Sequence, residues 1–330
     1  MNFFILISYI LVGYSATAEY PTFKSPHTIR GTAQGTTYDI KYYASDQVIS
    51  KSEVDSIFRV IDESMSLYKP NSLINQFNSR DVKGVKLDAH MYNVVKASFQ
   101  YYKMTKGYFD ITIFPLLKLW GFGPEGFRFN PSESQIDSVR KTVGLDKIKL
   151  RKDYLKKRDK YVSIDLNGIA QGYTVDVLSQ FIKSRGVDSF IVEVGGEIYA
   201  HGIKPSGERY KIEIQRPYSQ QIAPYRLELQ NKAITTSGSY EKFRILEGNR
   251  ISHHIDPHTG RPLMNNTLSV TIIANTAMEA DALDNYLMYL EPSAAINFIE
   301  KKTDCEAYII YSENNTLKEL QSSGFNNYIY

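Results

Sequence analysis

The sequence contains very little cysteine and very little excess charge. Its 330 residues include a single cysteine, Cys305, so no disulfide can form within the chain. Cys305 lies in the apolar run CEAYIIY, where burial explains a thiol better than a role as a nucleophile. The 39 basic and 36 acidic residues leave a net charge of +3. So small and dispersed a charge argues against a nucleic acid as a partner.

Long apolar runs are also absent after the first residues. The stretch from Phe3 to Val12 is apolar and is followed by an Ala-Thr-Ala sequence ending at Ala18, as in a secretory signal and its cleavage site. It is too short for a confident membrane span, and no lysine or arginine precedes it. We predict a signal peptide over residues 1–18 and an exported domain over residues 19–330.

Apolar periodicity predicts both helices and strands. The helical segments are 51–68, 88–105, 129–144, a helix starting near 169, 276–290 and 293–301. The strands are 35–43, 161–165, 189–196, 209–215, 225–230, 232–238, 268–274 and 305–311. In the segment 129–144 we expect Asn130 to cap the helix, Pro131 to begin it and Gly144 to end it. This irregular order predicts an α+β fold, with mixed or antiparallel sheets and packed helices in one composite domain.

The stretch SHHIDPHTGRP, residues 252–262, places three of the six histidines within six positions. A zinc site would need these imidazoles to converge, but His253 and His254 would point to opposite faces of a strand. DPHTG is typical of a β-turn, which explains Asp256 and Gly260 without any chemistry. One strand histidine could still serve as a base in a cleft, because its ordinary pKa lies near neutrality.

Two further stretches have both a chemical and a structural interpretation. In MEADALDNYL, Asp281 and Asn285 share a helix face and could hold Mg²⁺, or they could be an ordinary solvated face. In SIDLNGIAQGYTVD, a strand ending at Asp165 and the spacing of Gly168 and Gly172 could expose backbone N–H groups to a phosphate. Ordinary packing of a helix on a strand explains the same glycines equally well.

Taken together, these stretches resemble the ApbE family of FAD:protein FMN transferases. The resemblance extends from about Gly31 to Leu290 and rests on eight ordered motifs. They are GTAQGTTY, MSLYKPNSLINQFN, GYFDITIFPLLKLWGF, IDLNGIAQGYTVD, VEVGGEIYAHG, TTSGSYEKF, SHHIDPHTGRP and EADAL.

The resemblance implies an exported, T-fold-like α+β protein, periplasmic or attached to the periplasmic face of the inner membrane. It implies that the protein binds FAD, uses Mg²⁺ and splits the flavin's pyrophosphate. FMN would be esterified onto a threonine or serine of an exported or membrane-anchored electron-transfer protein, and AMP would leave. Phosphoryl transfer of this kind needs a cation and donors that stabilise the charged oxygens.

The resemblance also assigns individual roles. The carbonyl of Ala170 and the side chain of Asp281 would bind Mg²⁺, and Asn285 stands where the family usually has a hydroxyl ligand. His253 would deprotonate the acceptor hydroxyl, and it aligns with the histidine of the family sequence SHIIDP. Positions expected to contact FAD are Gln34, Tyr68, Tyr108, Phe109, Asp110, Asp165 and Gln171, although many relatives have methionine and lysine in place of Gln34 and Gln171. TTSGSY is expected to pack near the flavin and not to be a self-flavinylation site.

Two other functions fit the same residues. Water could replace the acceptor hydroxyl, which would make the protein a Mg²⁺-dependent FAD pyrophosphatase that yields FMN and AMP. Alternatively, the protein could bind FAD without cleaving it, an interpretation that the departure at Asn285 favours.

Overall fold

The computed structural model describes residues 24–126, 130–214, 225–239, 243–246 and 249–330. The predicted signal peptide and residues 240–242 of the TTSGSYEKF motif lie outside these residues. The helices are α1 (Lys51–Met65), α2 (Leu73–Asn78), α3 (Ala89–Met104), α4 (Phe114–Leu119), α5 (Glu133–Arg140), α6 (Asn167–Ser184), α7 (Ala277–Leu287) and α8 (Pro292–Ile299), with 3-10 turns η1 (Ile111–Ile113), η2 (Leu145–Lys147) and η3 (Phe325–Tyr328). None of the helices in the described ranges is long and apolar enough to cross a membrane.

The largest sheet has eight strands, and all its pairings are antiparallel. In spatial order they are β1 (Ser25–Ala33), β2 (Thr36–Ala44), β6 (Phe190–Val194), β7 (Glu197–His201), β10 (Lys232–Gly238), β13 (Thr267–Ala274), β14 (Glu306–Glu313) and β15 (Thr316–Gln321). Smaller sheets pair β8 (Tyr210–Ile214) with β9 (Tyr225–Leu229), β11 (Phe243–Leu246) with β12 (Asn249–Ser252), and β3 (Gly84–Lys86) with β5 (Tyr154–Lys157) and β4 (Ile148–Arg151). The antiparallel α+β architecture predicted from the sequence is confirmed.

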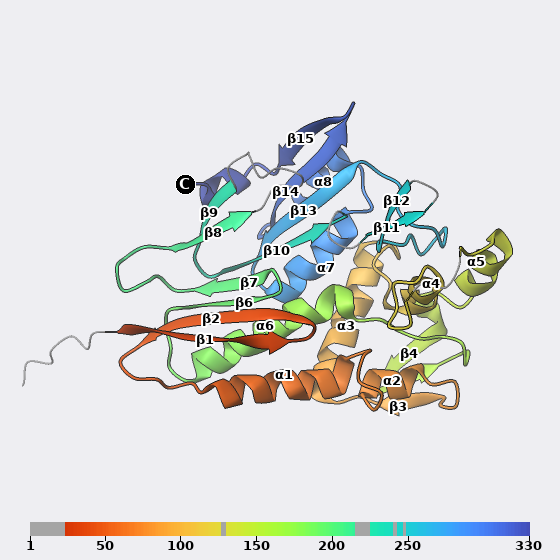
Figure 1. The fold of residues 1–330 in the computed structure, drawn as a ribbon, viewed down its shortest axis with the longest axis horizontal. Coiled ribbons are helices and arrows are strands. Elements are labelled where there is room, and N and C mark those ends of the chain that lie inside the picture. The colour runs from red at the N-terminus through yellow and green to blue at the C-terminus, as the bar shows by residue number, and fades with distance from the viewer. Residues whose placement is uncertain (1–23, 127–129, 215–224, 240–242, 247–248) are drawn as a thin grey trace, which may run out of the picture.

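Helices cover one face of the large sheet, and a hairpin covers part of the other (Figure 1). On α6, Leu178 and Ile182 pack with Val192 of β6 in one buried cluster. On β13, Ile272 packs with the α7 side, whereas its neighbour Ile273 packs with the β8–β9 hairpin. Successive strand residues point to opposite faces, so both faces of the central strands are buried, and α6 and α7 are held rigidly against the sheet.

A second group of elements packs beside this helical layer. It contains α2, α3 and the sheet β3-β5-β4, whose apolar side chains form one buried cluster with the start of α6. Helix α1 joins the two parts, because Phe58 packs with the large-sheet cluster and Ile61 with the other. The two parts form the single α+β domain that the sequence predicted.

Several local predictions were wrong at particular residues. Helix α5 begins at Glu133, with Ser132 as its N-cap in a capping box with Gln135, so Asn130 and Pro131 precede it. It ends at Arg140, before Gly144. Strand β14 is not the last strand, since the mostly exposed β15 follows it. Strand β1, at the opposite edge, was also missed.

The segment 161–165 does not form the predicted strand. Its backbone bonds instead to a side chain: Ile164 N–H donates to Asn78 Oδ1 at 2.7 Å, and Asn78 Nδ2 donates to the Ile164 carbonyl at 2.9 Å. Asp165 N–H donates to the Ile111 carbonyl at 2.8 Å. Asn78 therefore takes the place of a neighbouring strand and holds the chain that leads to Asp165.

We expect Asn78→Ala to lower the free energy of unfolding by about 2–3 kcal/mol. The substitution leaves the N–H and the carbonyl of the buried Ile164 without their hydrogen-bond partner. Denaturant unfolding would measure this loss. Gln76→Ala, which removes an exposed bond to the Asn71 carbonyl, is the control. Equal stability of the two variants would show that the Asn78 pair carries no net stabilisation.

Candidate active site

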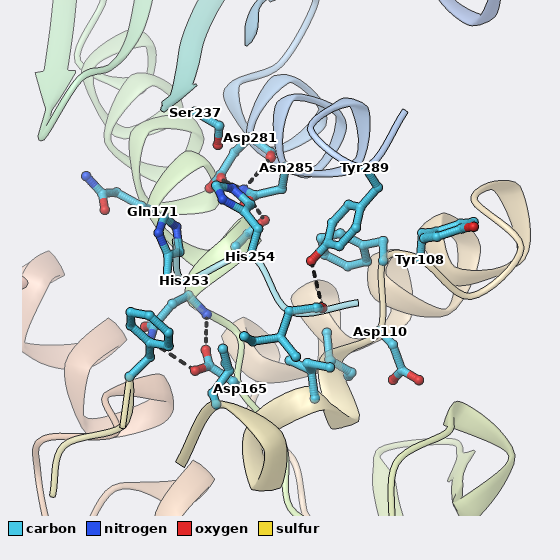
Figure 2. Close-up of a pocket in the computed structure, with 18 of the residues that line it drawn as sticks. Tyr108, Asp110, Asp165, Gln171, Ser237, His253, His254, Asp281, Asn285 and Tyr289 are labelled. Atoms are coloured by element: carbon cyan, nitrogen blue, oxygen red, sulfur yellow. Dashed lines mark hydrogen bonds between the residues drawn. The ribbon is translucent and has the colours of Figure 1, made fainter. Parts of the chain in front are cut away.

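The candidate active site is a cavity of about 340 Å³ where the start of α6, helix α7 and the chain after β12 meet. Its volume lies in the range of small-molecule sites. The lining residues are Tyr68, Tyr108, Phe109, Asp110, Ile111, Ile113, Leu117, Phe122, Asp165, Asn167, Gly168, Gln171, Gly195, Glu197, Thr236, Ser237, Gly238, His253, His254, Ile255, Asp281, Asn285 and Tyr289. Figure 2 labels ten of them and shows how they lie.

Most of the predicted site residues meet at this cavity. His253, Asp281 and Asn285 line it, as do Tyr68, Tyr108, Phe109, Asp110, Asp165 and Gln171. Gln34 and Ala170 are not among the described lining residues. They are connected to each other through Thr174, whose hydroxyl accepts from Gln34 Nε2 at 3.1 Å and donates to the Ala170 carbonyl at 2.8 Å. In this arrangement the Ala170 carbonyl is already engaged by a hydroxyl.

A second cavity, of about 410 Å³, lies on β4 and β5. Its described lining residues are Lys149, Arg151, Tyr154, Lys156, Lys157 and Arg158. It offers no carboxylate or imidazole for acid–base chemistry, so the first cavity is the candidate site.

The histidine stretch does not have the strand geometry that we expected. Strand β12 ends at Ser252, so the chain is irregular at His253 and His254, and their rings are not forced to opposite faces. The ring centroids lie 4.2 Å apart, and both rings line the cavity. Within the described part of the chain, no group of three histidine, cysteine or acidic side chains is arranged to hold a metal.

The turn that follows is formed as predicted. Asp256 Oδ1 accepts from the His258 N–H at 2.8 Å, and the Asp256 carbonyl accepts from the Gly260 N–H at 2.7 Å. Gly260 has φ +73°, a backbone conformation that glycine adopts without strain. Its carbonyl accepts from Trp120 Nε1 at 2.8 Å. The turn therefore fixes the chain that carries His253 and His254, and the exposed His258 does not line the cavity.

Helix α7 carries two buried acids, of which Asp281 lines the cavity. Asp281 and Asp284 are 3% and 2% exposed, and burial raises the pKa of both carboxyl groups. Repulsion from Asp281 raises the pKa of Asp284 further. Asp281 Oδ2 accepts from the Gly172 N–H at 2.9 Å. Asp284 Oδ1 accepts from the Ser237 hydroxyl at 3.1 Å. The alternative interpretation of Asp281, an ordinary solvated helix face, is therefore wrong.

Asn285 lies between these acids and the start of α6. Its Nδ2 donates to Asp281 Oδ1 at 3.2 Å, to Asp284 Oδ1 at 3.3 Å and to the Gly168 carbonyl at 3.4 Å. A rotation of the amide by 180° would exchange its nitrogen for its oxygen. Asn285 therefore stands where it can offer either a donor to the acids or an oxygen ligand beside them.

The glycines of the α6 start serve close packing. A Cβ on Gly172 would lie 2.3 Å from the Ala277 carbonyl oxygen, so only glycine lets α6 and α7 approach this closely. Gly168 has a non-helical ψ of 17°, and its Cα faces the Asn285 side chain. The packing interpretation holds for Gly172, and the close approach is what places Asp281 beside the first turn of α6.

Asp176 on α6 anchors the start of α7. Its two carboxylate oxygens accept from the Ala277 and Met278 N–H groups at 2.8 and 3.0 Å, which satisfies donors that a helix start leaves unpaired. Burial raises the pKa of Asp176 to about 6. The folded state therefore binds this proton more tightly than the unfolded state does.

The raised pKa of Asp176 predicts that the free energy of unfolding falls as the pH rises. The stabilisation from Asp176 is complete below the ordinary carboxyl range and is lost as pH rises through about 6. Two pKa units correspond to about 3 kcal/mol, so the wild-type protein should lose about that much more unfolding free energy than Asp176→Asn between pH 4 and 7.5. Urea unfolding at both pH values measures the difference. Parallel pH profiles would contradict the prediction.

Sequence reasoning missed some lining residues. Phe122, Glu197 and Ser237 lie inside the quoted motifs but were not singled out, whereas Tyr289 lies after the last motif. Tyr289 donates to the Ile255 carbonyl at 3.1 Å, a contact across 34 residues that no local pattern reveals. His254 was given no role because only His253 aligns with the histidine of the family sequence SHIIDP.

Comparison with known proteins identifies the family of the chain. The model of the ApbE family matches residues 34–309. The chain belongs to the ApbE family. The chain is 33% identical over 286 residues to the FAD:protein FMN transferase of Escherichia coli strain K12. The match covers 84% of this chain and 81% of that one. It is 31% identical over 304 residues to that of Vibrio cholerae, covering 90% and 91%.

Solved ApbE structures share the fold. The flavin transferase ApbE from Vibrio cholerae superposes with a TM-score of 0.85 at 30% identity, covering 93% of this chain and 100% of that one. The apo flavinyl transferase ApbE of Pseudomonas stutzeri gives a TM-score of 0.84 at 30% identity, covering 93% and 98%. Similarity over nearly the whole length shows that the α+β domain is that of the ApbE flavin transferases.

Proposed function

We propose that this protein transfers the FMN half of FAD to a threonine or serine hydroxyl of an acceptor protein and releases AMP in a Mg²⁺-dependent reaction. The observation that carries the proposal is that the His253 imidazole and the buried acid Asp281 line the same cavity in a chain of the ApbE family. The names of the relatives, FAD:protein FMN transferase, support the same reaction.

The charge of the cavity supports the requirement for a cation. Four acids line it, Asp110, Asp165, Glu197 and Asp281, and the described lining residues include no lysine or arginine. A pyrophosphate entering such a site would be repelled unless a cation offset the charge. Carboxylate and amide oxygens are ligands that Mg²⁺ prefers, so Asp281, with Asn285 after rotation of its amide, fits the ion. Bound there, Mg²⁺ would neutralise charge on the phosphate oxygens.

The residues of the chain then have distinct tasks. The acceptor oxygen forms a bond to the phosphorus of the FMN half, and the bond from that phosphorus to the AMP oxygen breaks. His253 takes the proton of the acceptor hydroxyl as this bond forms. The rings of Tyr108 and Tyr289, whose centroids lie 5.7 Å apart, give the cavity aromatic surface on which a flavin or adenine ring can pack.

The acceptor and the location are part of the proposal. An exported or membrane-anchored electron-transfer protein would supply the hydroxyl, on the periplasmic side, after removal of residues 1–18. The leader-like sequence of the first residues motivates this location. Mass spectrometry of the native protein should find an N-terminus near Glu19, and an intact Met1 would contradict cleavage.

One incubation tests the reaction. The protein lacking residues 1–18 is mixed with FAD and Mg²⁺, with and without an acceptor peptide that carries a threonine motif, and AMP and peptide mass are followed. A mass gain equal to FMN that chelator abolishes is expected. AMP without peptide modification would favour the FAD pyrophosphatase, and intact FAD in every condition would favour a protein that only binds it.

A further inference from the structure

His254 is buried at the candidate active site with no partner for its ring. It is 2% exposed, and neither Nδ1 nor Nε2 has a hydrogen-bond partner among the described residues. A neutral imidazole carries one N–H donor and one acceptor nitrogen. Buried polar groups in folded proteins are almost always paired, so an unpaired ring on a cavity wall is a candidate to bind a ligand that enters the cavity.

The surroundings of His254 favour a neutral ring. Burial lowers its pKa well below the ordinary histidine range, and the neighbouring His253 lowers it further. Tyr289 packs edge-on against it, with ring centroids 6.2 Å apart. The ring thus presents one fixed N–H in a site where little water competes for it, which is the condition under which a hydrogen bond is strongest.

The position of His254 indicates which part of a ligand it meets. Its ring centroid lies 4.2 Å from that of His253, and Figure 2 shows both rings on the side of the cavity that Asp281 and Asn285 enter from α7. A base that deprotonates the attacking hydroxyl must lie close to the phosphorus under attack. A ring in contact with that base, tilted by 38° from it, therefore lies beside the same phosphate.

We propose that His254 is a substrate-binding residue whose ring N–H donates a hydrogen bond to the phosphate of the FMN half of FAD. The identity of the ligand, FAD, rests on the proposed function. His254 stands where the family sequence SHIIDP has isoleucine.

Binding measurements without turnover test the proposal. Dissociation constants for FMN and for riboflavin, which differ by one phosphate, are measured for the wild-type protein, His254→Leu and His254→Gln, with and without Mg²⁺. His254→Leu should weaken FMN binding about tenfold or more, roughly the 1.4 kcal/mol of one hydrogen bond to a charged group, and riboflavin binding less than twofold. His254→Gln, which keeps a donor, should recover part of the loss.

The control and the contrary results are equally specific. His201→Leu is the matched control, because His201 Nδ1 is also buried without a partner but His201 does not line the cavity. It should leave the ratio of the two dissociation constants unchanged. Equal losses for FMN and riboflavin in His254→Leu, or no loss, would overturn the proposal, as would a wild-type protein that prefers riboflavin. A wild-type protein that fails to transfer FMN would refute the proposed function but leave this ratio measurable.

Discussion

His253→Ala is expected to reduce FMN transfer by about 10³-fold, in the range found when a positioned general base is removed. The acceptor hydroxyl would then lose the imidazole that is proposed to take its proton. FAD binding should change little, because the cavity has many other lining side chains. Single-turnover transfer to an acceptor peptide, followed by mass, measures the rate, and fluorescence titration measures FAD binding.

Two controls make this result interpretable. His253→Gln keeps polarity and size but cannot act as a base at neutral pH, so it should be as inactive as the alanine variant. A small base added to the solution, such as imidazole, should restore part of the rate of His253→Ala. Normal transfer by either variant would remove His253 from the reaction, and loss of FAD binding in both would make it a binding residue instead.

Apolar periodicity predicted the fold class because it depends on local patterns, whereas most of the cavity residues were implied by the resemblance to the ApbE family. The strands β2, β6, β10 and β13 have buried alternation or continuous apolar runs, and motif residues such as Asp281 and Gln171 are carried by elements that local periodicity identifies. What such patterns miss is an element stabilised at an edge. Strand β15 has mainly exposed side chains, so no apolar period marks it.

The remaining errors come from contacts between distant residues. The segment before Asp165 looks like a strand in sequence, but Asn78, 86 residues away, makes the hydrogen bonds that a neighbouring strand would make. His253 and His254 were expected on opposite faces of a strand because the end of β12 at Ser252 leaves no mark in the sequence. In both cases the backbone conformation follows from a tertiary contact or an element end, which single-sequence propensity does not contain.

The buried acid of α7 provides a test in which function and stability should move in opposite directions. Asp281→Asn keeps the shape of the side chain and an oxygen that can accept from the Gly172 N–H, but it removes the negative charge that the proposed Mg²⁺ site needs. We expect transfer to fall by about 10³-fold or more, since electrostatic stabilisation of transferring phosphoryl groups is commonly worth that much.

The same variant should be more stable than the wild-type protein when no divalent ion is present. Burial raises the pKa of Asp281 and of Asp284, so the stability that each protonated acid contributes is lost as pH rises above the ordinary carboxyl range. The gain in melting temperature from Asp281→Asn should therefore be larger at pH 8 than at pH 5. Mg²⁺ should raise the melting temperature of the wild-type protein, as any ligand of the folded state does, and leave that of Asp281→Asn unchanged.

Glu279→Gln is the matched control for this pair of measurements. Glu279 lies on the same helix, two residues before Asp281, and pairs with Lys302 at 3.4 Å without lining the cavity. Its substitution should preserve both transfer and the response to Mg²⁺. If Mg²⁺ raised the melting temperatures of all three proteins equally, the ion would bind elsewhere. If Asp281→Asn were instead inactive and less stable, Asp281 would act as a structural acid whose charge the fold requires.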